Sequence, residues 1–199
     1  MYESSVHTVN VGIHPGGNLI ASTTSVCTGD TVNFNATGPV GANYTFYVDG
    51  SIAKPKSSSA TFTTNTLNNG EIVSVVIEDT AGSGCEFSPP GIPVLVTNYP
   101  VASLTSTSVT LFTICDGETP TFEATFTPDA SYQFYIEGIP VSSDAVSGNF
   151  LFTSLVTRTL EHNDIIGVQI TNSNGCSSAA TITLSVNAFI GSDVITTTT

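Results

Sequence analysis

The sequence predicts an all-β protein made of two antiparallel β-sandwiches in tandem, and three observations support this prediction. The composition is typical of strands and turns, because the chain holds 31 threonines and 24 serines while only 10% of its residues are charged. A long segment of the sequence occurs twice. Within each copy, apolar and polar residues alternate with a period of two, which is the period of a half-buried strand.

The repeat is ungapped over its first part. Residues 27–50, CTGDTVNFNATGPVGANYTFYVDG, align with residues 115–138, CDGETPTFEATFTPDASYQFYIEG, at a constant offset of 88. Residues 67–79 match residues 160–172 after an insertion in the second copy. We therefore expect four parts: 1–17 as a leading segment, the last strand of a preceding repeat; 18–98 as the first repeat; 99–188 as the second; and 189–199 as the start of a following repeat or a tail.

Six strands are expected in each copy, separated by turns rich in Gly, Asn and Asp. In the first copy they are Leu19–Ser25, Thr31–Thr37, Tyr44–Val48, Ala60–Thr64, Ile72–Glu78 and Ile92–Thr97. In the second copy they are Ser103–Phe112, Thr119–Thr125, Tyr132–Ile136, Phe150–Ser154, Ile165–Thr171 and Ala180–Asn187. The leading segment adds a further strand at Val6–Val11. This number of short strands in about 90 residues indicates an antiparallel sandwich.

The spacing within each copy matches the pattern of immunoglobulin-like domains, in which two cysteines bridge the sheets. Ala36 and Ser74 occupy those two cysteine positions in the first copy, and Ala124 and Gly167 occupy them in the second. We therefore expect small residues to face each other where the usual disulfide would lie.

Three runs carry a resemblance to a known family. Both copies contain C-x-G-x-x-x-x-F-x-A, then Y-x-F-Y-x-x-G, and end in Gly-Cys. These runs resemble the tandem Ig-like or PKD-like repeats of Bacteroidota surface proteins, among them the very large gliding-motility adhesins that the type IX secretion system exports. The resemblance covers roughly Asn18 to Ala188. It implies an extracellular, non-catalytic filament segment attached to the outer membrane at the bacterial cell surface.

The charge excludes nucleic acid as a partner. The formal net charge is -13, and only Lys54, Lys56 and Arg158 are available to contact phosphates. No apolar run approaches the roughly 18 residues of a membrane span, so direct membrane insertion is not expected. The partners that remain are neighbouring repeats of the same chain and surface polysaccharide.

No catalytic residue is predicted. The three histidines are His7, His14 and His162, and none lies in a nucleophile or zinc motif. The sequence also predicts no metal ligands and no cofactor, with calcium as the one alternative. Asp30 and Glu71 are expected at one end of the first copy, and Asp129 in a loop of the second, where they offer carboxylate oxygens. No Asp-x-Asp-x-Asp run accompanies them.

Four cysteines, Cys27, Cys85, Cys115 and Cys176, are expected to form structural disulfides in an oxidising compartment. Their spacing favours pairing within each copy. An immunoglobulin-like strand order instead puts Cys27 and Cys85 at opposite ends of a strand, about 20 Å apart, whereas a disulfide requires α-carbons within about 7 Å. The alternative is a bond from Cys27 to Cys176 across the repeat junction, and the sequence leaves both pairings open.

Tyr47 and Tyr135 are the candidate glycan contacts. They alternate with the core residues Phe46 and Phe134 on the third strand of each copy, so their rings point away from the core. The primary prediction is a non-catalytic structural and adhesive repeat segment of a large secreted surface filament. A carbohydrate-binding module and a passive spacer in a secreted hydrolase are the alternatives. The short linker Asn98–Ala102 predicts little free swivelling between the copies.

Overall fold

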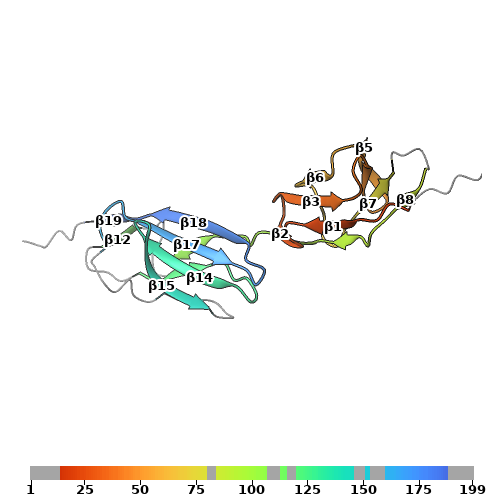
Figure 1. Cartoon of the computed structure of the whole chain (residues 1–199). Helices are drawn as coiled ribbons and strands as arrows, with labels where there is room; N and C mark the ends of the chain where they lie inside the picture. The colour runs from red at the N-terminus through yellow and green to blue at the C-terminus, as the bar shows by residue number, and fades with distance from the viewer. Residues whose placement is uncertain are drawn as a thin grey trace, which may run out of the picture. The chain divides into compact units, whose positions relative to one another are not determined.

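The computed structural model describes residues 14–79, 84–106, 113–115, 120–145, 151–152 and 160–187, with side chains omitted at 142–145 and 151–152. All regular elements in these ranges are β-strands, which confirms the all-β prediction (Figure 1). None of these residues belongs to a helix long and apolar enough to cross a membrane. The chain divides into two compact units, Met1–Asn98 and Tyr99–Thr199. The strand expected at Val6–Val11 and the segment 189–199 lie outside the described residues.

Unit 1 is a sandwich of two sheets. Its strands are β1 (Asn18–Ala21), β2 (Ser25–Cys27), β3 (Val32–Thr37), β4 (Asn43–Val48), β5 (Ser51–Ser57), β6 (Thr61–Thr64), β7 (Ile72–Glu78), β8 (Glu86–Phe87), β9 (Ile92–Pro93) and β10 (Leu95–Thr97). One sheet has the order β1-β3-β6, and the other has the order β5-β4-β7 with β8 and β9 both paired to β7. Strand β10 pairs with β2 in parallel. This is an immunoglobulin-like arrangement, with strands A, B and E facing C′, C, F and G.

Alternation along the strands builds the core between these sheets. Val73, Val75 and Ile77 of β7 are completely buried, while the residues between them are partly exposed. Phe34 and Phe46 are also completely buried, and the ring of Phe46 stacks on that of Phe62 with centroids 5.6 Å apart. These buried positions of β7 therefore fall on the inward face that a period of two predicts.

Unit 2 repeats the same arrangement. Its strands are β11 (Leu104–Ser106), β12 (Thr113–Cys115), β13 (Phe122–Ala124), β14 (Ser131–Ile136), β15 (Ile139–Ala145), β16 (Leu151–Phe152), β17 (Ile165–Thr171), β18 (Ser177–Thr183) and β19 (Ser185–Asn187). The sheets have the orders β11-β13-β16 and β15-β14-β17-β18, and β12 pairs in parallel with β19. Phe122 and Phe134 fill the core, as Phe34 and Phe46 do in unit 1.

Strands β5, β8, β12 and β15 were not anticipated from the sequence, and β5 and β15 are the longest of them. Strand β5 and its counterpart β15 follow the third strand of each copy and form the outer edge of their sheets. The first expected strand, Leu19–Ser25, is instead two short strands that pair with β3 and with β10. A break between them at Ser22, whose amide donates to the carbonyl of Asn33, moves the chain from one sheet to the other.

The sequence predicts that two small residues face each other in the core of each unit, and this prediction is wrong for one residue of each pair. Ala36 and Ala124 are buried in the core, as expected. Ser74 and Gly167 instead lie opposite Tyr47 and Tyr135, the residues expected to point outward. Because a shift of one residue turns a strand side chain to the other face, the core positions of this strand are the neighbouring valines and isoleucines.

Candidate functional site

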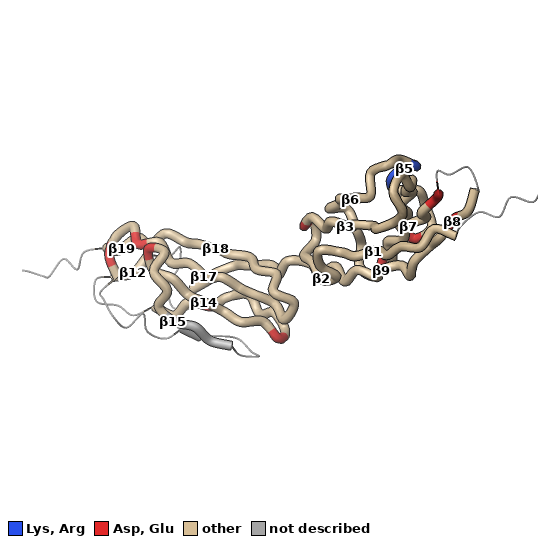
Figure 2. The backbone as a smooth tube through the Cα atoms, in the orientation of Figure 1, with Lys and Arg blue, Asp and Glu red and all other residues tan. Residues whose placement is uncertain are grey.

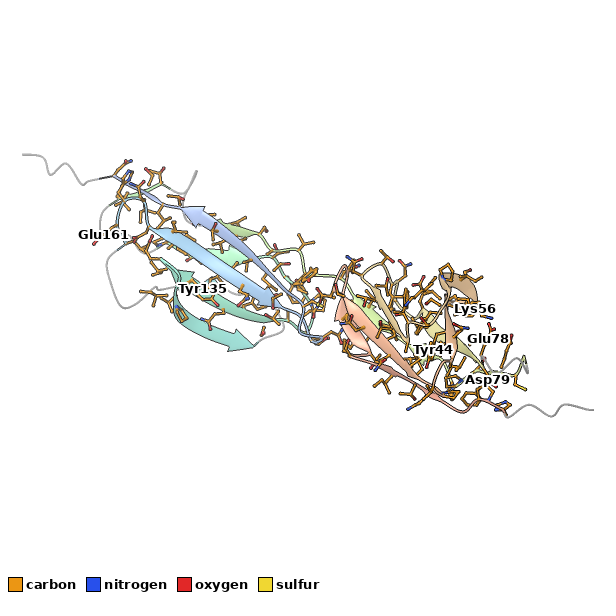
Figure 3. The ribbon with its side chains drawn as sticks, turned by 45° about the horizontal axis from the view of Figure 1, so that its top comes forward. Tyr44, Lys56, Glu78, Asp79, Tyr135 and Glu161 are labelled. Atoms are coloured by element: carbon orange, nitrogen blue, oxygen red, sulfur yellow. The ribbon has the colours of Figure 1, made fainter. Side chains whose placement is uncertain are left out.

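Tyr135, which Figure 3 labels on unit 2, lines an apolar hollow on the outer face of a sheet. Tyr135 pairs with Gly167 on β17, and its phenol donates a hydrogen bond to Oε1 of Gln169, 3.1 Å away. The hollow has a volume of about 130 Å³. Its lining residues are Tyr135, Gly138, Ile165, Gly167, Val168, Ala179, Ala180 and Thr181. This volume is below that of an enclosing small-molecule pocket, so the hollow suits one face of a ring stacked on the sheet.

Gly167 leaves the space that forms part of this hollow. A Cβ atom placed on it would lie 3.5 Å from Cγ2 of Thr181 and 3.7 Å from Cβ of Tyr135, both ordinary van der Waals distances. The glycine is therefore not required by a close approach, and a small side chain would fit where the hollow now lies.

Tyr47 occupies the equivalent position in unit 1, but its surroundings differ. Its partner on β7 is Ser74, and on β5 it pairs with Ile52, which is 64% exposed. A hydroxymethyl group thus stands where unit 2 has only a hydrogen atom. The two tyrosines that the sequence treats as equivalent consequently have different local surfaces, and each lies in its own unit.

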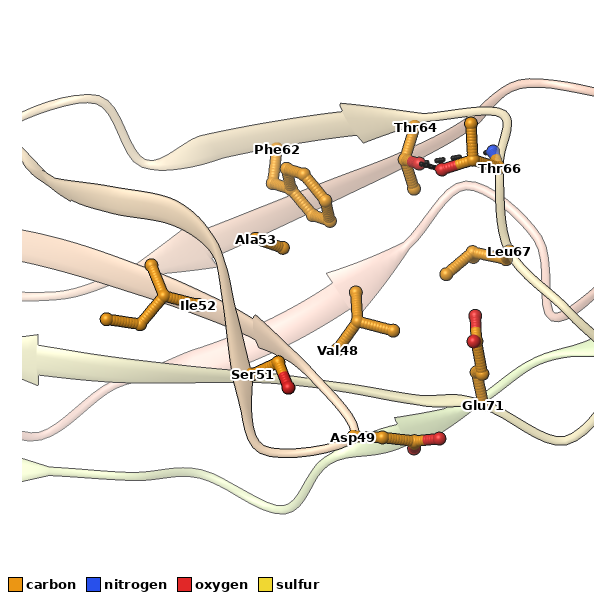
Figure 4. Close-up of a pocket in the computed structure, with 10 residues that line it drawn as sticks. All are labelled: Val48, Asp49, Ser51, Ile52, Ala53, Phe62, Thr64, Thr66, Leu67 and Glu71. Atoms are coloured by element: carbon orange, nitrogen blue, oxygen red, sulfur yellow. Dashed lines mark hydrogen bonds between the residues drawn. The ribbon is translucent and has the colours of Figure 1, made fainter.

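A larger groove opens in unit 1 (Figure 4). Its volume is about 510 Å³. Its lining combines apolar side chains, hydroxyl groups and two carboxylates. The apolar residues are Val48, Ile52, Ala53, Phe62 and Leu67, the hydroxyl residues are Ser51, Thr64 and Thr66, and the carboxylates belong to Asp49 and Glu71. Apolar lining with a few polar groups is the usual composition of a ligand site. Sequence reasoning did not find this groove, because three of its residues come from β5, the strand it missed.

The carboxylates of the groove already have structural partners. Oδ1 of Asp49 accepts a hydrogen bond from the amide of Ile72 at 2.9 Å. Oε2 of Glu71 accepts from the amide of Asn68, and Oε1 accepts from the side-chain amide of the same residue, both at 2.9 Å. These groups therefore cap turns between strands, and most of the acidic positions that Figure 2 colours lie in loops or at strand ends.

The acidic residues that the sequence offers as calcium ligands do not come together as a cluster. In the described part of the chain, no group of three or more His, Cys, Asp or Glu side chains could hold a metal ion. Oδ2 of Asp30 accepts a hydrogen bond from the amide of Cys27, and Glu71 caps the turn described above. Asp129 has a positive φ of 55° in its turn, in unit 2.

The cysteines lie at the two ends of each unit. Cys27 and Cys176 each take part in a disulfide. Cys176 is completely buried, whereas Cys115 is exposed and Cys85 is partly buried. Cys27 pairs with Thr97 at the end of β10, and the carbonyl of Cys85 accepts a hydrogen bond from the amide of Asp79 just beyond β7. A disulfide and a β-sandwich fold are together typical of extracellular domains.

Two of the histidines have packing partners. The ring of His14 meets Phe87 edge-on with centroids 5.3 Å apart. Nδ1 of His162 accepts a hydrogen bond from the amide of Val186 at 3.2 Å, which fixes the turn before β17 to strand β19. His7 lies outside the described residues.

No family model matches this sequence, and no curated protein does. Solved structures match it over most of its length. The chain is similar to the fibronectin(III)-like modules of Clostridium thermocellum CbhA, at 15% identity and a TM-score of 0.47, covering 85% of this chain and 94% of that one. It is similar to an I-band fragment of titin at 13% identity and a TM-score of 0.46, with coverages of 89% and 67%.

A third similar structure is murine CEACAM1b, at 10% identity and a TM-score of 0.45, covering 86% of this chain and all of that one. The fold of this protein is assigned from the strand order within each of its own units.

Proposed function

We propose that this chain is a non-catalytic structural and adhesive segment of a large secreted filament at a bacterial cell surface, of the gliding-motility adhesin type. The observation that supports this proposal most directly is the equivalence of the two units. Both have equivalent strand orders and a buried pair of phenylalanines at equivalent positions. In both, a carboxylate in the turn after the third strand accepts a hydrogen bond from a backbone amide. Repetition of one sandwich adds length to a chain without adding a new site.

The surface chemistry supports the same proposal. With 16 acidic and 3 basic residues, the chain keeps a strongly negative, well hydrated surface. The lysines of the described residues lie on β5, where Lys56 forms an ion pair with Glu78 (Figures 2 and 3). Lysine and proline on an outer strand discourage pairing with other chains, which a crowded filament requires.

Adhesion can be measured on beads. Beads that carry the chain at defined density are allowed to settle on glass coated with a bacterial surface polysaccharide, and their retention is recorded as the flow rate rises. We expect greater retention than for beads carrying albumin, an acidic protein, at equal density. Equal retention on the two kinds of bead would reject the adhesive part of the proposal and favour a passive spacer.

Carbohydrate binding by unit 2 is a second candidate, and the hollow beside Tyr135 is the observation that favours it. A sugar ring presents a flat face of C–H groups that packs on a tyrosine ring. The hollow that Gly167 leaves next to that ring would receive the edge of the same sugar. Gln169, which accepts the phenol hydrogen bond, has amide hydrogens that can donate to sugar hydroxyls.

A glycan array with three variants tests this candidate. Tyr135→Ala removes the stacking surface, and Gly167→Ala fills the hollow without a close contact. Both are expected to lower binding at least tenfold. Tyr47→Ala is the matched control, because Tyr47 holds the same strand position in unit 1 opposite Ser74. If all three variants bind as the parent chain does, or if Tyr47→Ala alone loses binding, the assignment to unit 2 is wrong.

A further inference from the structure

We propose that the groove of unit 1 binds an extended peptide of a partner protein, which pairs with the edge of β6 and presents one basic and one apolar side chain. The groove lies within unit 1, between β5 and β6, which are edge strands of the two sheets (Figure 4). Its volume of about 510 Å³ is in the usual range of ligand sites. The backbone of β6, the floor of the groove and its acidic end each define one feature of the peptide.

Strand β6 offers backbone groups to a peptide. Among the strands that the structure describes, it pairs only with β3. The amide of Ala36 donates to the carbonyl of Ala60 at 2.8 Å, and bonded pairs alternate along an antiparallel ladder, so Phe62 also bonds towards β3. The backbone groups of Thr61 and Thr63 therefore point away from β3, towards the open side. Such an edge can take an extended peptide as an added strand.

The composition of β6 leaves this edge able to pair. Its residues, Thr61–Thr64, include no charge and no proline. The edge strand of the other sheet, β5, carries Pro55 and two lysines instead. Charges and prolines are the usual means by which a protein keeps an edge strand from pairing. Of the two edges that border the groove, only β6 therefore lacks this protection.

Lys54 joins the two edges at one end of the groove. Its ammonium reaches from β5 to β6, where it donates to Oγ of Ser59 at 2.8 Å and to the carbonyl of Thr61. It also lies 5.7 Å from the centroid of the Phe46 ring. These contacts fix the spacing between β5 and β6 before any ligand arrives. A peptide therefore meets a groove that is already formed, which lowers the entropy cost of binding.

The floor of the groove is apolar. Val48 and Phe62 are partly buried and pack against the core of unit 1, and Leu67 is a buried member of that core. An added strand would direct alternate side chains over this floor, because the side chains of a strand alternate with a period of two. One inward position of the peptide therefore suits an apolar side chain, which would be removed from water there.

The other end of the groove carries two carboxylates. Asp49 and Glu71 come together because Oδ1 of Asp49 accepts a hydrogen bond from the amide of Ile72, the residue after Glu71. A carboxylate has about four acceptor positions, of which this bond takes one of Asp49, and the bonds to Asn68 take two of Glu71. The next inward position of the peptide, about 7 Å further along the strand, therefore suits arginine or lysine.

Charge complementarity favours a partner protein over the other occupants. A second copy of this chain brings 16 acidic and 3 basic residues, so it is repelled from an acidic groove. A neutral polysaccharide supplies no cation for the carboxylates. The site lies in unit 1 alone and goes beyond the proposed function, which specifies no protein partner.

A titration followed by NMR tests the proposal on the full ¹⁵N-labelled chain. The probes are the capped heptapeptides GTRTLTG and GTLTRTG, since an added strand can be parallel or antiparallel. We expect at least one order to give saturable shifts of the amide signals of Thr61 and Thr63, with the signals of unit 2 unmoved. Replacing the arginine by glutamate, or the leucine by serine, should weaken binding at least about fivefold.

A matched pair of variants locates the basic side chain. Asp49→Asn removes a charge but keeps a side-chain oxygen that can accept from the amide of Ile72. We expect it to weaken binding at least about threefold. Glu137→Gln is the control, because Glu137 caps the amide of Ile165 in the equivalent turn of unit 2 and the net charge changes equally. It should bind as the parent chain does. Equal weakening by both variants would reduce the effect to general charge attraction and overturn the proposal.

Three further results would also overturn it. The absence of saturable shifts with both peptides would show that the groove does not bind such a segment. Shifts of the same signals on concentrating the chain alone would assign the edge of β6 to a second copy. Equal shifts with butylammonium would assign the groove to a small organic cation. The peptide titrations use the parent chain, so they do not depend on the folding of a variant, and they contain no polysaccharide, so they can fail separately from the adhesion assay.

Discussion

At the scale of single residues, both repeats form the turn after the third strand in the same way. Asp49 and Glu137 adopt positive φ angles of 46° and 51°, and each is followed by a glycine with positive φ. Asp49 caps the amide of Ile72, and Glu137 caps that of Ile165 at 2.6 Å. Two successive residues with positive φ form the turn that suits a tightly twisted hairpin. The carboxylates therefore fix the turns that join strands, in both units.

Gly50→Ala tests the backbone contribution of this turn. Gly50 has a φ of +77°, and a Cβ atom there would meet no other atom within 4 Å, so the substitution changes conformational energy without a clash. We expect unit 1 to lose about 1 kcal/mol of unfolding free energy in urea. Gly16→Ala is the control, because that position is equally open and has no positive φ. Equal stability of the two variants would contradict the backbone argument.

The outward positions of Tyr47 and Tyr135 could be predicted at this scale, because alternation with buried Phe46 and Phe134 fixes which face a strand residue occupies. The hollow beside Tyr135 could not. It depends on the register between β14 and β17, which sets Gly167 opposite that tyrosine. The sequence showed Gly167 as a small residue but placed it on the inner face.

At the scale of elements, β7 and β17 were predicted with the bounds that the structure has, since their alternating Ile and Val residues fill a core. Strand β5 was missed because its sequence, SIAKPKS, has no alternating pattern and its residues are mostly exposed. Pairing with β4 alone creates this strand. A proline and two lysines are unfavourable in a central strand and are common on an edge.

These residues of β5 are expected to prevent association between chains. The double variant Pro55→Val and Lys56→Val restores a backbone donor and removes a charge on an outer strand. We expect it to form dimers or larger species in light scattering at concentrations where the parent chain is monodisperse. Asn35→Val is the control, since β3 has partners on both sides and the added valine meets no open strand edge. Association of both variants to the same extent would attribute the effect to hydrophobicity alone.

At the scale of the whole molecule, each unit has a hydrophobic core of its own. Phe34 and Phe46 belong to one core, and Phe122 and Phe134 belong to the other. No buried residue of either cluster comes from the other unit among the described residues. Separate cores predict that the two units unfold independently of each other.

The variants Phe46→Ala and Phe134→Ala should each lower the stability of one unit and leave that of the other unchanged. Each residue is completely buried, and truncating a buried phenylalanine costs about 3–5 kcal/mol. In Phe46→Ala the amides of β7 should exchange with deuterium at least about a hundredfold faster, because each 1.4 kcal/mol corresponds to about a factor of ten. The amides of β17 should keep their parent rates, and Phe134→Ala should give the reverse pattern. Faster exchange of both strands in either variant would mean that the chain unfolds as a single cooperative unit, and repetition of an independent sandwich would then no longer describe how this protein is built.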